Sequence, residues 1–441
     1  MEIHSMKYSH YNVCLPYGEQ YVLYNTLEQR LLFIQSELKE LMEMYKTSEL
    51  KEIHPEFFNY MVEEKFIIND EIDELDEIKK ISKSIDEDNS LFLLTINPTM
   101  NCNFKCWYCY ENLVKSSRLD ENGLSKIKKL IDTITNNKDL KNMNISFFGG
   151  EPLLYFNKNV IPIINYYLER CAEKNINAYT SFTTNGYLAN QEFINFFLDK
   201  NVRCNLQITL DGHKEEHNKV RYISQNKGSY DKIVSNIKNL IKNKFYVNVR
   251  INFTDSNIFN ANKIYDDFED VEEDIKTQFL KFDFHRVWQN KKIDQTQDIA
   301  DKEMNQINSK GGKTSCHEYS PDTLRNSCYA DKKNSVVINY NGDIFKCTAR
   351  DFSTKNREGY LTENGELFWE NDSLNKRMNS KFKNRPCLEC KILPLCNGGC
   401  SQTALESLAA NREYCVYSWD ETEKEKVIRN KISEILENAN K

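Results

Sequence analysis

Three cysteines stand within eight residues in the segment CNFKCWYC, at positions 102, 106 and 109. Three thiolates on one short loop can hold three irons of a 4Fe–4S cluster and leave the fourth iron open to a substrate or cofactor. Zinc is the rival metal, but a closed zinc site needs a fourth ligand that this loop does not supply. The spacing therefore favours an iron–sulfur cluster with one open position.

Three more segments, rich in glycine and polar residues, stand just past apolar stretches of strand length, as the cysteine loop does. They are FGGEP (148–152), TTNG (183–186) and TLDG (209–212). Taken singly, the glycines can form tight turns and the Thr, Asn and Asp side chains can cap helices. Their shared position is what suggests a common site.

The elements that must position these segments alternate between strands and helices. Strands are predicted at 91–96, 143–150, 178–186, 203–212, 247–253 and 279–287, with helices such as VIPIINYYLERC and YDKIVSNIKNLIKN between them. Six such repeats predict a parallel sheet with right-handed crossovers, an α/β partial (β/α)6 TIM barrel. Catalytic residues in such barrels gather at the C-terminal ends of the strands, where all four segments stand.

The cysteine loop matches CxxxCxφC, in which φ is aromatic, and resembles the cluster loop of the radical S-adenosylmethionine (SAM) superfamily. FGGEP resembles the GGEP element of that superfamily. The resemblance implies that Cys102, Cys106 and Cys109 bind a 4Fe–4S cluster and that SAM chelates its open iron. Reductive cleavage of SAM would then give methionine and a 5′-deoxyadenosyl radical, which takes a hydrogen atom from the substrate.

The same resemblance implies a set of SAM contacts: Tyr108, Gly149, Gly150, Glu151, Pro152, Thr183, Asn185, Thr209 and Arg221. Arg221 is expected on the SAM carboxylate, although it could be an ordinary surface cation. Asp211 is expected to be a catalytic base, because the corresponding acid of related enzymes can face the substrate.

Eight of the fourteen cysteines lie between positions 316 and 415. Seven of them resemble the SPASM pattern, CX9–15GX4C, CX2CX5CX3C and C, of peptide-modifying radical SAM enzymes. That resemblance implies two auxiliary 4Fe–4S clusters, and so three in all. Its ligand sets would be Cys387, Cys390, Cys396 and Cys415 for one cluster, and Cys328, Cys347 and Cys400 for the other. Cys316 is the candidate eighth ligand, and if it does not bind, one auxiliary cluster keeps an open iron. A pair of zinc sites is the alternative.

Residues 1–90 have a different organisation. Two strands are predicted within 12–25, a helix over 27–45, a second helix near 54–66, and a solvated helix or linker in the acidic stretch that follows. We expect a small winged-helix-like α+β domain that resembles leader-peptide recognition elements. The barrel would then occupy 91–305 and the cysteine-rich iron–sulfur (SPASM) domain 306–441.

Composition excludes several classes of protein. The net charge of −7 has no basic stripe for nucleic acid, and no apolar run is long enough to span a membrane. Fourteen cysteines without an export signal indicate metal binding in a reducing, cytoplasmic setting.

The organisation as a whole predicts a maturase of ribosomally made peptides. Its partners would be a precursor peptide and a low-potential electron donor of the flavodoxin or ferredoxin type, and its product a thioether or carbon–carbon crosslink. One alternative is oxidation of Ser or Cys to formylglycine, as in anaerobic sulfatase-maturating enzymes. The other is an iron–sulfur electron-transfer or scaffold protein without turnover.

Overall fold

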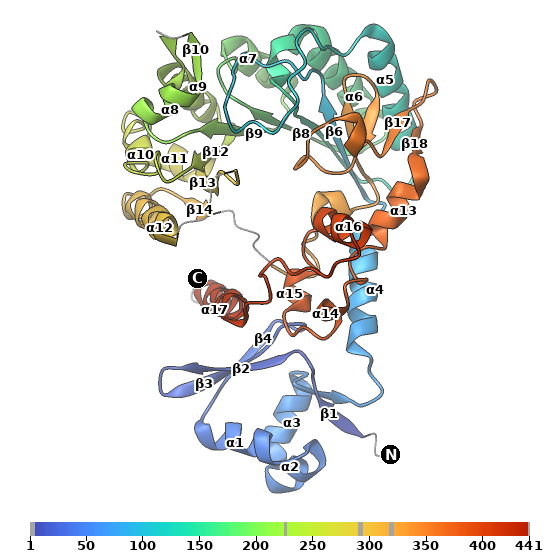
Figure 1. Cartoon of the computed structure of the whole chain (residues 1–441), viewed down its shortest axis with the longest axis vertical. Helices are drawn as coiled ribbons and strands as arrows, with labels where there is room; N and C mark the ends of the chain where they lie inside the picture. Colours follow the sequence, from blue (N-terminus) through green and yellow to red (C-terminus); the bar gives the residue numbers. More distant parts are fainter. Residues whose placement is uncertain (1–4, 225–226, 290–293, 317–321, 440–441) are drawn as a thin grey trace. The chain divides into compact units, whose positions relative to one another are not determined.

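The computed structural model describes residues 5–224, 227–289, 294–316 and 322–439 (Figure 1). The chain divides into two compact units. The first contains residues 1–88, 319–333 and 374–441, and the second contains residues 89–318 and 334–373. Each unit is therefore built from segments that are distant in sequence. The three predicted domain boundaries stay a prediction.

The second unit is organised around a large parallel sheet. Six parallel strands follow one another in chain order: β6 (Leu91–Asn97), β7 (Asn142–Phe147), β8 (Asn177–Thr184), β9 (Cys204–Leu210), β12 (Tyr246–Phe253) and β13 (Leu280–Arg286). These are the six strands predicted from the sequence. The α/β fold with a parallel sheet is confirmed.

The sheet continues beyond these six strands on both sides. β14 (Thr314–Cys316) pairs in parallel with β13. On the other side, β15 (Ser335–Asn339) pairs in parallel with β6, and the antiparallel strands β16 (Asp343–Phe345), β17 (Gly359–Leu361) and β18 (Leu367–Trp369) follow. The segment SVVINYNGDIFKC thus contains two strands, β15 and β16, that extend the large sheet.

Helices cover one face of this sheet (Figure 1). They are α5 (Glu121–Thr135), α6 (Ile161–Glu173), α7 (Gln191–Lys200), α8 (Lys214–Val220), α9 (Tyr230–Lys242), α10 (Lys263–Asp266), α11 (Glu273–Phe279) and α12 (Asp294–Ser309). Alternate strand residues, such as Val249 and Ile251 on β12, join the helices in one apolar core. The intervening residues of that strand are polar: Asn248, Arg250 and Asn252. Because side chains alternate along a strand, the opposite face of the sheet there is polar.

The first unit contains a three-stranded antiparallel sheet of β2 (Asn12–Tyr17), β3 (Gln20–Asn25) and β4 (Arg30–Ile34). A second pair joins β1 (Met6–Tyr8) to β5 (Ile67–Asn69). Its helices are α1 (Ser36–Met44), α2 (Thr47–Ile53), α3 (Pro55–Glu63), α4 (Glu74–Asp86), α14 (Arg385–Leu388), α15 (Leu393–Cys396), α16 (Ser401–Ala409) and α17 (Glu421–Ala439). α13 (Ser373–Met378) begins at the boundary between the two units.

The helix predicted over 27–45 is wrong in its first half. Residues 30–34, RLLFI, form β4, and the helix begins only at Ser36. A short apolar run fits the periodicity of a helix as well as that of a strand, and here antiparallel pairing with β3 makes it a strand. The acidic stretch does contain a helix, α4, but that helix is not simply solvated, because it buries Ile78 and Ser82.

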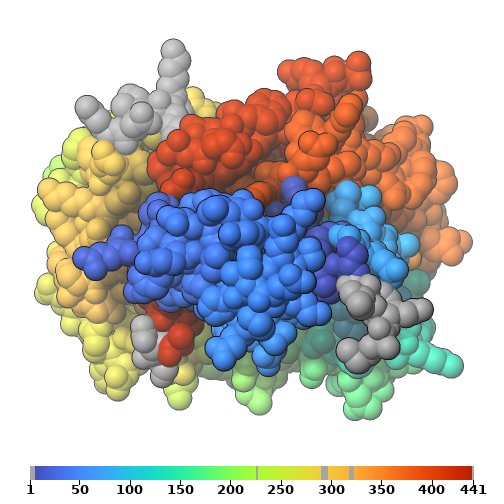
Figure 2. Space-filling view, turned by 90° about the horizontal axis from the view of Figure 1, so that it is seen from below, coloured from blue at the N-terminus to red at the C-terminus, as the bar shows by residue number. Residues whose placement is uncertain are grey.

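Both faces of the three-stranded sheet are covered within the first unit. One face, with Leu23 and Ile34, packs against α2 and α3. The other face, with Val22 and Tyr24, packs against Ile392 and Leu395 near α15 and against Ile428 and Ile432 on α17. Figure 2 shows the N-terminal residues in blue beside red C-terminal residues. None of the helices in the described ranges has the length and apolar character to cross a membrane.

Candidate active site

The cysteine loop follows β6 and is anchored by a buried aromatic residue. Phe104 lies in the core, with its ring centroid 6.0 Å from that of Tyr187. Cys102 and Cys106 are half-buried, whereas Cys109 is exposed. Burial, followed by the charge of Glu151, raises the pKa of Cys102 to about 12. The Cys102 thiol therefore stays protonated until a metal takes the place of its proton.

The two glycines of FGGEP allow its backbone to lie directly against the cysteine loop. The Gly150 N–H donates to the Thr99 carbonyl at 3.0 Å, and the Glu151 N–H donates to the Asn101 carbonyl at 2.9 Å. A Cβ atom at Gly149, where φ is +96°, would lie 2.7 Å from the Thr99 oxygen, and one at Gly150 would overlap the Asn101 oxygen. The glycines are therefore required for this close approach, in addition to any turn that they form.

Glu151 holds the ends of two strands together. Its fully buried carboxylate accepts hydrogen bonds from the Leu153 N–H at 3.0 Å, the Thr184 hydroxyl at 2.7 Å and the Asn185 N–H at 2.9 Å. Burial raises its pKa, and these three donors oppose the rise. Both carboxylate oxygens are thus engaged within the protein. Pro152 follows at the start of a short 3-10 helix. Contacts of these two residues with SAM stay a prediction.

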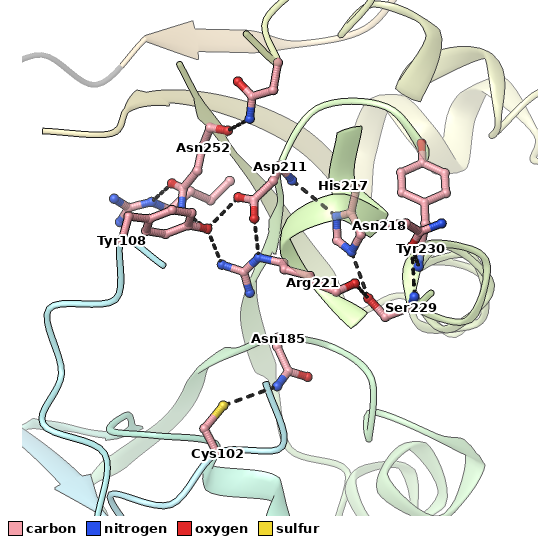
Figure 3. Close-up of polar contacts among 12 residues, drawn as sticks. Cys102, Tyr108, Asn185, Asp211, His217, Asn218, Arg221, Ser229, Tyr230 and Asn252 are labelled. Atoms are coloured by element: carbon pink, nitrogen blue, oxygen red, sulfur yellow. Dashed lines mark hydrogen bonds and ion pairs between the residues drawn. The ribbon is translucent and has the colours of Figure 1, made fainter. Parts of the chain in front are cut away.

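TTNG is tied to the cysteine loop by Asn185. Its side-chain amide donates to the Asn103 Oδ1 at 2.8 Å and lies 3.9 Å from the Cys102 Sγ (Figure 3). Thr183 is half-buried on β8, and Thr209 is buried on β9. The structure therefore brings FGGEP, TTNG and the cysteine loop together, as the sequence predicted.

A second network joins the cysteine loop to TLDG and β12 (Figure 3). The Tyr108 hydroxyl donates to the Asp211 Oδ1 at 2.6 Å and accepts from Arg221 at 2.7 Å and from Asn252 at 3.1 Å. The Arg221 Nε donates to the Asp211 Oδ2 at 2.8 Å. Burial lowers the pKa of Arg221, but the charges of Asp211 and Cys106 raise it by more. The pKa of Arg221 is therefore well above its usual value.

Asp211 is fully buried, and both of its carboxylate oxygens are engaged in this network. Its backbone N–H donates to the Nδ1 of His217, whose Nε2 lies 2.9 Å from the Ser229 hydroxyl. Burial, and then Arg221, lowers the pKa of His217 well below its usual value, so the ring is neutral. The geometry suits Asp211 as the charge partner of Arg221. Its role as a base stays a prediction.

Three residues near these loops were missed by sequence reasoning. Asn97 is fully buried at the end of β6, and its side-chain N and O have no partner among the described residues. Glu111, two residues after Cys109, is half-buried, and its two carboxylate oxygens are buried without a partner in the described ranges. Burial raises its pKa well above normal. Asn252 could have been found, because it stands near the end of a predicted strand.

The residues fit a cluster with SAM. Asn97 lies beside Gly149, since a Cβ atom on that glycine would come within 3.0 Å of the Asn97 side chain. A buried amide without partners is costly, and a polar ligand in this position would satisfy it. The three cysteines supply thiolates for three irons, and Arg221 supplies a cation beside them.

The first unit contains a separate cysteine-lined cavity. Its lining includes the four residues predicted as one ligand set, Cys387, Cys390, Cys396 and Cys415, together with Lys424. The Asn384 side chain donates to the Cys387 Sγ at 2.9 Å, and backbone N–H groups of Ile392 and Gly399 stabilise the thiolates of Cys390 and Cys396. Amide donors to thiolates are typical of iron–sulfur sites.

These sulfurs do not converge on one point. Across the described residues, no group of three His, Cys, Asp or Glu side chains lies close enough to share one metal ion. For the remaining predicted ligands, Cys328 is exposed and Cys400 half-buried in the first unit. In the second unit, Cys316 accepts from Gln297 at 3.6 Å and Cys347 from the Ala349 N–H at 3.3 Å. Their cluster stays a prediction.

Comparison with known proteins agrees with this geometry. The Radical SAM superfamily model matches residues 96–268. A cysteine-type anaerobic sulfatase-maturating enzyme of Clostridium novyi (strain NT) is 28% identical over 346 residues, 70% of this chain and 88% of that enzyme. The radical SAM cyclopropyl synthase TigE of Paramaledivibacter caminithermalis is 25% identical over 258 residues, 54% of this chain and 51% of that enzyme.

A solved structure extends the likeness in fold to most of the chain. SuiB of Streptococcus suis bound to SAM has a TM-score of 0.52 at 15% identity, covering 93% of this chain and 99% of SuiB. SuiB bound to the precursor peptide SuiA has a TM-score of 0.50 at 16% identity, covering 90% and 95%. The fold and the cysteine loop define an iron–sulfur, SAM-binding protein. The chain carries a radical SAM domain and is a radical SAM superfamily enzyme.

Proposed function

We propose that this enzyme installs a crosslink, a thioether or a carbon–carbon bond, in a ribosomally made precursor peptide. When bound, the 4Fe–4S cluster and SAM supply a carbon-centred radical that removes a hydrogen atom from an unactivated C–H bond. The chain itself contributes the loop of Cys102, Cys106 and Cys109 and the buried cation Arg221. Glu151 contributes the hydrogen bonds that join FGGEP to TTNG. A flavodoxin or ferredoxin type of donor would supply the electron.

The observation that carries the peptide proposal is the open edge of β4 in the first unit. Within the described residues, β4 has no strand partner other than β3. The outer edge of β2 is less open, because Lys391 donates to the Asn12 carbonyl, Arg429 donates to the Pro16 carbonyl, and Pro16 has no N–H. An extended peptide can add to an open strand edge, and β4 leads directly into α1.

Exposed apolar side chains lie on β4 and on the helix that follows it. Phe33 on β4 is 38% exposed and contacts Tyr17 with ring centroids 5.3 Å apart, and Met44 at the end of α1 is 71% exposed. Such side chains offer contact area to alternate residues of an added strand. SuiB, which resembles this chain in fold over 90% of its length, has been solved with a precursor peptide bound.

Removing residues 1–88 is a poor test, because Val22 and Tyr24 form one core with α17. We therefore propose Phe33→Glu with Met44→Glu in the full chain. The matched control is Ile53→Glu with Tyr60→Glu, whose side chains are 49% and 43% exposed on α2 and α3. The probe is a fluorescent leader segment of a short peptide encoded beside the gene.

The edge variant should weaken leader binding by at least about tenfold, and the control should stay within about twofold. Formation of 5′-deoxyadenosine without peptide should be the same in both. Equal leader binding by the two variants would mean that the leader peptide binds elsewhere. A precursor that keeps its mass and carries no crosslink after turnover would refute maturation itself.

We also propose that the chain holds three 4Fe–4S clusters. Anaerobically reconstituted protein should then contain roughly twelve irons per chain, and the variant with Ala at Cys102, Cys106 and Cys109 roughly eight. The triple variant should lose 5′-deoxyadenosine formation. Stoichiometric zinc with little iron would refute the cluster assignment of the C-terminal cysteines.

A second candidate is oxidation of Ser or Cys to formylglycine. The similarity to the C. novyi sulfatase-maturating enzyme favours it. The two functions are separated by their products, because a formylglycine aldehyde reacts with an aminooxy reagent and a crosslinked peptide does not.

A further inference from the structure

Arg250 lies on the polar face of β12, one strand residue before Ile251 and two before Asn252. Its neighbours in the sheet register are Thr209 on β9 and Asp283 on β13. Side chains at paired positions of parallel strands lie on the same face of the sheet. Arg250 therefore lies between a hydroxyl and an acid, inside the barrel rather than past the strand ends.

The guanidinium of Arg250 is only partly satisfied. Its Nε donates to the Asn252 Oδ1 at 2.8 Å, and within the described ranges no other acceptor is bonded to it. Burial lowers its pKa, against the opposing effects of Tyr110, Tyr108 and Asp283. An arginine stays charged in proteins nonetheless. Arg250 is half-buried, so its remaining N–H groups can bind an anion that enters this face of the sheet.

The acid next to Arg250 is already engaged. The Asp283 Oδ2 lies 2.6 Å from the His285 Nε2, and its Oδ1 accepts from the Ser315 hydroxyl at 2.7 Å. Arg221 shows what a satisfied arginine looks like in the same barrel, since it donates to both Asp211 and Tyr108 (Figure 3). Of these two arginines, Arg250 is the one whose terminal N–H groups have no protein acceptor in the described ranges.

We propose that Arg250, with the Thr209 hydroxyl beside it, binds a carboxylate of the peptide substrate. An Asp or Glu side chain, or the C-terminal carboxylate, matches the guanidinium fork. This inference rests on the proposed function, because it assigns a specificity determinant to that peptide.

Two observations favour the peptide over SAM as the source of this carboxylate. The charges that act on Arg221 include the Cys106 thiol, whereas those that act on Arg250 are Tyr110, Tyr108, Asp283 and Arg221. Arg221 is thus the arginine that acts on the thiols of the cluster loop, whereas Arg250 faces the two tyrosines of that loop. Arg250 also precedes Asn252 on the strand, and Asn252 already contacts Tyr108. A group that reaches Arg250 has entered deeper than the cluster loop.

The test combines Arg250→Gln and Arg250→Lys with a series of precursor peptides. In the series, each Asp or Glu is replaced singly by Asn or Gln, and one peptide has an amidated C-terminus. Arg250→Gln should raise the KM for the parent peptide by about 10- to 100-fold, with the Kd for SAM and the yield of 5′-deoxyadenosine within twofold. The KM of Arg250→Lys should lie between those of the parent enzyme and Arg250→Gln, because lysine keeps the charge and lacks the forked guanidinium.

One peptide of the series should reproduce the same rise in KM with the parent enzyme. It should show no further rise with Arg250→Gln, because the two changes remove one contact. If no peptide in the series shows such coupling, the proposal is overturned. It is also overturned if Arg250→Gln weakens SAM binding tenfold and leaves the peptide KM unchanged, because the carboxylate is then that of SAM.

A small probe separates this inference from the proposed function. N-acetyl-L-glutamate amide should bind the SAM-loaded holoenzyme, as measured by saturation-transfer NMR. N-acetyl-L-glutamine amide should not bind, and Arg250→Gln should abolish the difference. This result can be obtained even if no precursor is modified. Equal binding of the two probes to the parent enzyme refutes the carboxylate site. If Arg250→Gln does not fold, the probe pair and the peptide series with the parent enzyme still decide.

Discussion

Replacing Asp211 by Asn separates two roles for this acid, charge partner and catalytic base. The change keeps the shape of the side chain and removes the negative charge that faces Arg221 at 2.8 Å. Asp211 is fully buried and the Arg221 side chain is 10% exposed, so water cannot take over the lost charge. Breaking a buried ion pair by removing one partner costs about 3 to 5 kcal/mol.

That cost is large enough to measure as a shift in melting temperature. For domains of about 150 to 250 residues, each kcal/mol shifts Tm by roughly 2 to 4 °C, so Asp211→Asn should lower the Tm of the metal-free chain by roughly 6 to 20 °C. The matched control is Asp270→Asn, because Asp270 pairs with Lys238 at 2.6 Å but is 58% exposed. An exposed pair contributes only about 0.2 to 1 kcal/mol.

The assay pairs circular dichroism melting with anaerobic measurement of 5′-deoxyadenosine. As a charge partner, Asp211 holds Arg221 and Tyr108 against the cysteine loop, so the variant should lose both stability and SAM cleavage. As a base acting on the substrate, it should lose only the peptide product. A Tm within 2 °C of that of the control, with SAM cleavage intact and no product, would refute the charge-partner role of Asp211.

Three more outcomes follow from the described contacts. Gly150→Ala should push the Asn101 carbonyl away from the cysteine loop. The variant should therefore bind less iron at Cys102, Cys106 and Cys109, and as much iron as the parent at the C-terminal cysteines. Mössbauer spectra can show the difference. His217 has a lowered pKa in the folded chain, so the unfolded chain binds the extra proton. The free energy of unfolding should then fall as pH drops below about 6.5, by up to about 1.4 kcal/mol per pH unit, and His217→Gln should flatten that slope in denaturant titrations. Lys424→Met should lower the midpoint potential of the cluster held by the four cysteines around it, because a cation that lines their cavity is lost. The potential is measured by EPR titration. Lys426→Met should leave the potential unchanged, because the Lys426 side chain is 62% exposed in its ion pair.

The parts of this molecule that sequence reasoning predicted are those fixed by local pattern. The six parallel strands are apolar runs with turn residues after them, and the motif positions follow from those strand ends. Residues 30–34 show the limit, because RLLFI fits a helix or a strand until β3 is available to pair with it. Arg250 shows another limit. Its partners depend on the register of β9, β12 and β13, which no local pattern specifies.

The covering of the N-terminal sheet has a consequence for biosynthesis. Val22 and Tyr24 leave the ribosome long before Ile428 and Ile432, which cover them. One face of the three-stranded sheet therefore stays uncovered while the parallel sheet of the second unit is synthesised. Contacts between such distant residues form late and slowly, and an exposed apolar sheet face is prone to aggregate meanwhile. We expect newly made chains to depend on a chaperone until α17 has emerged.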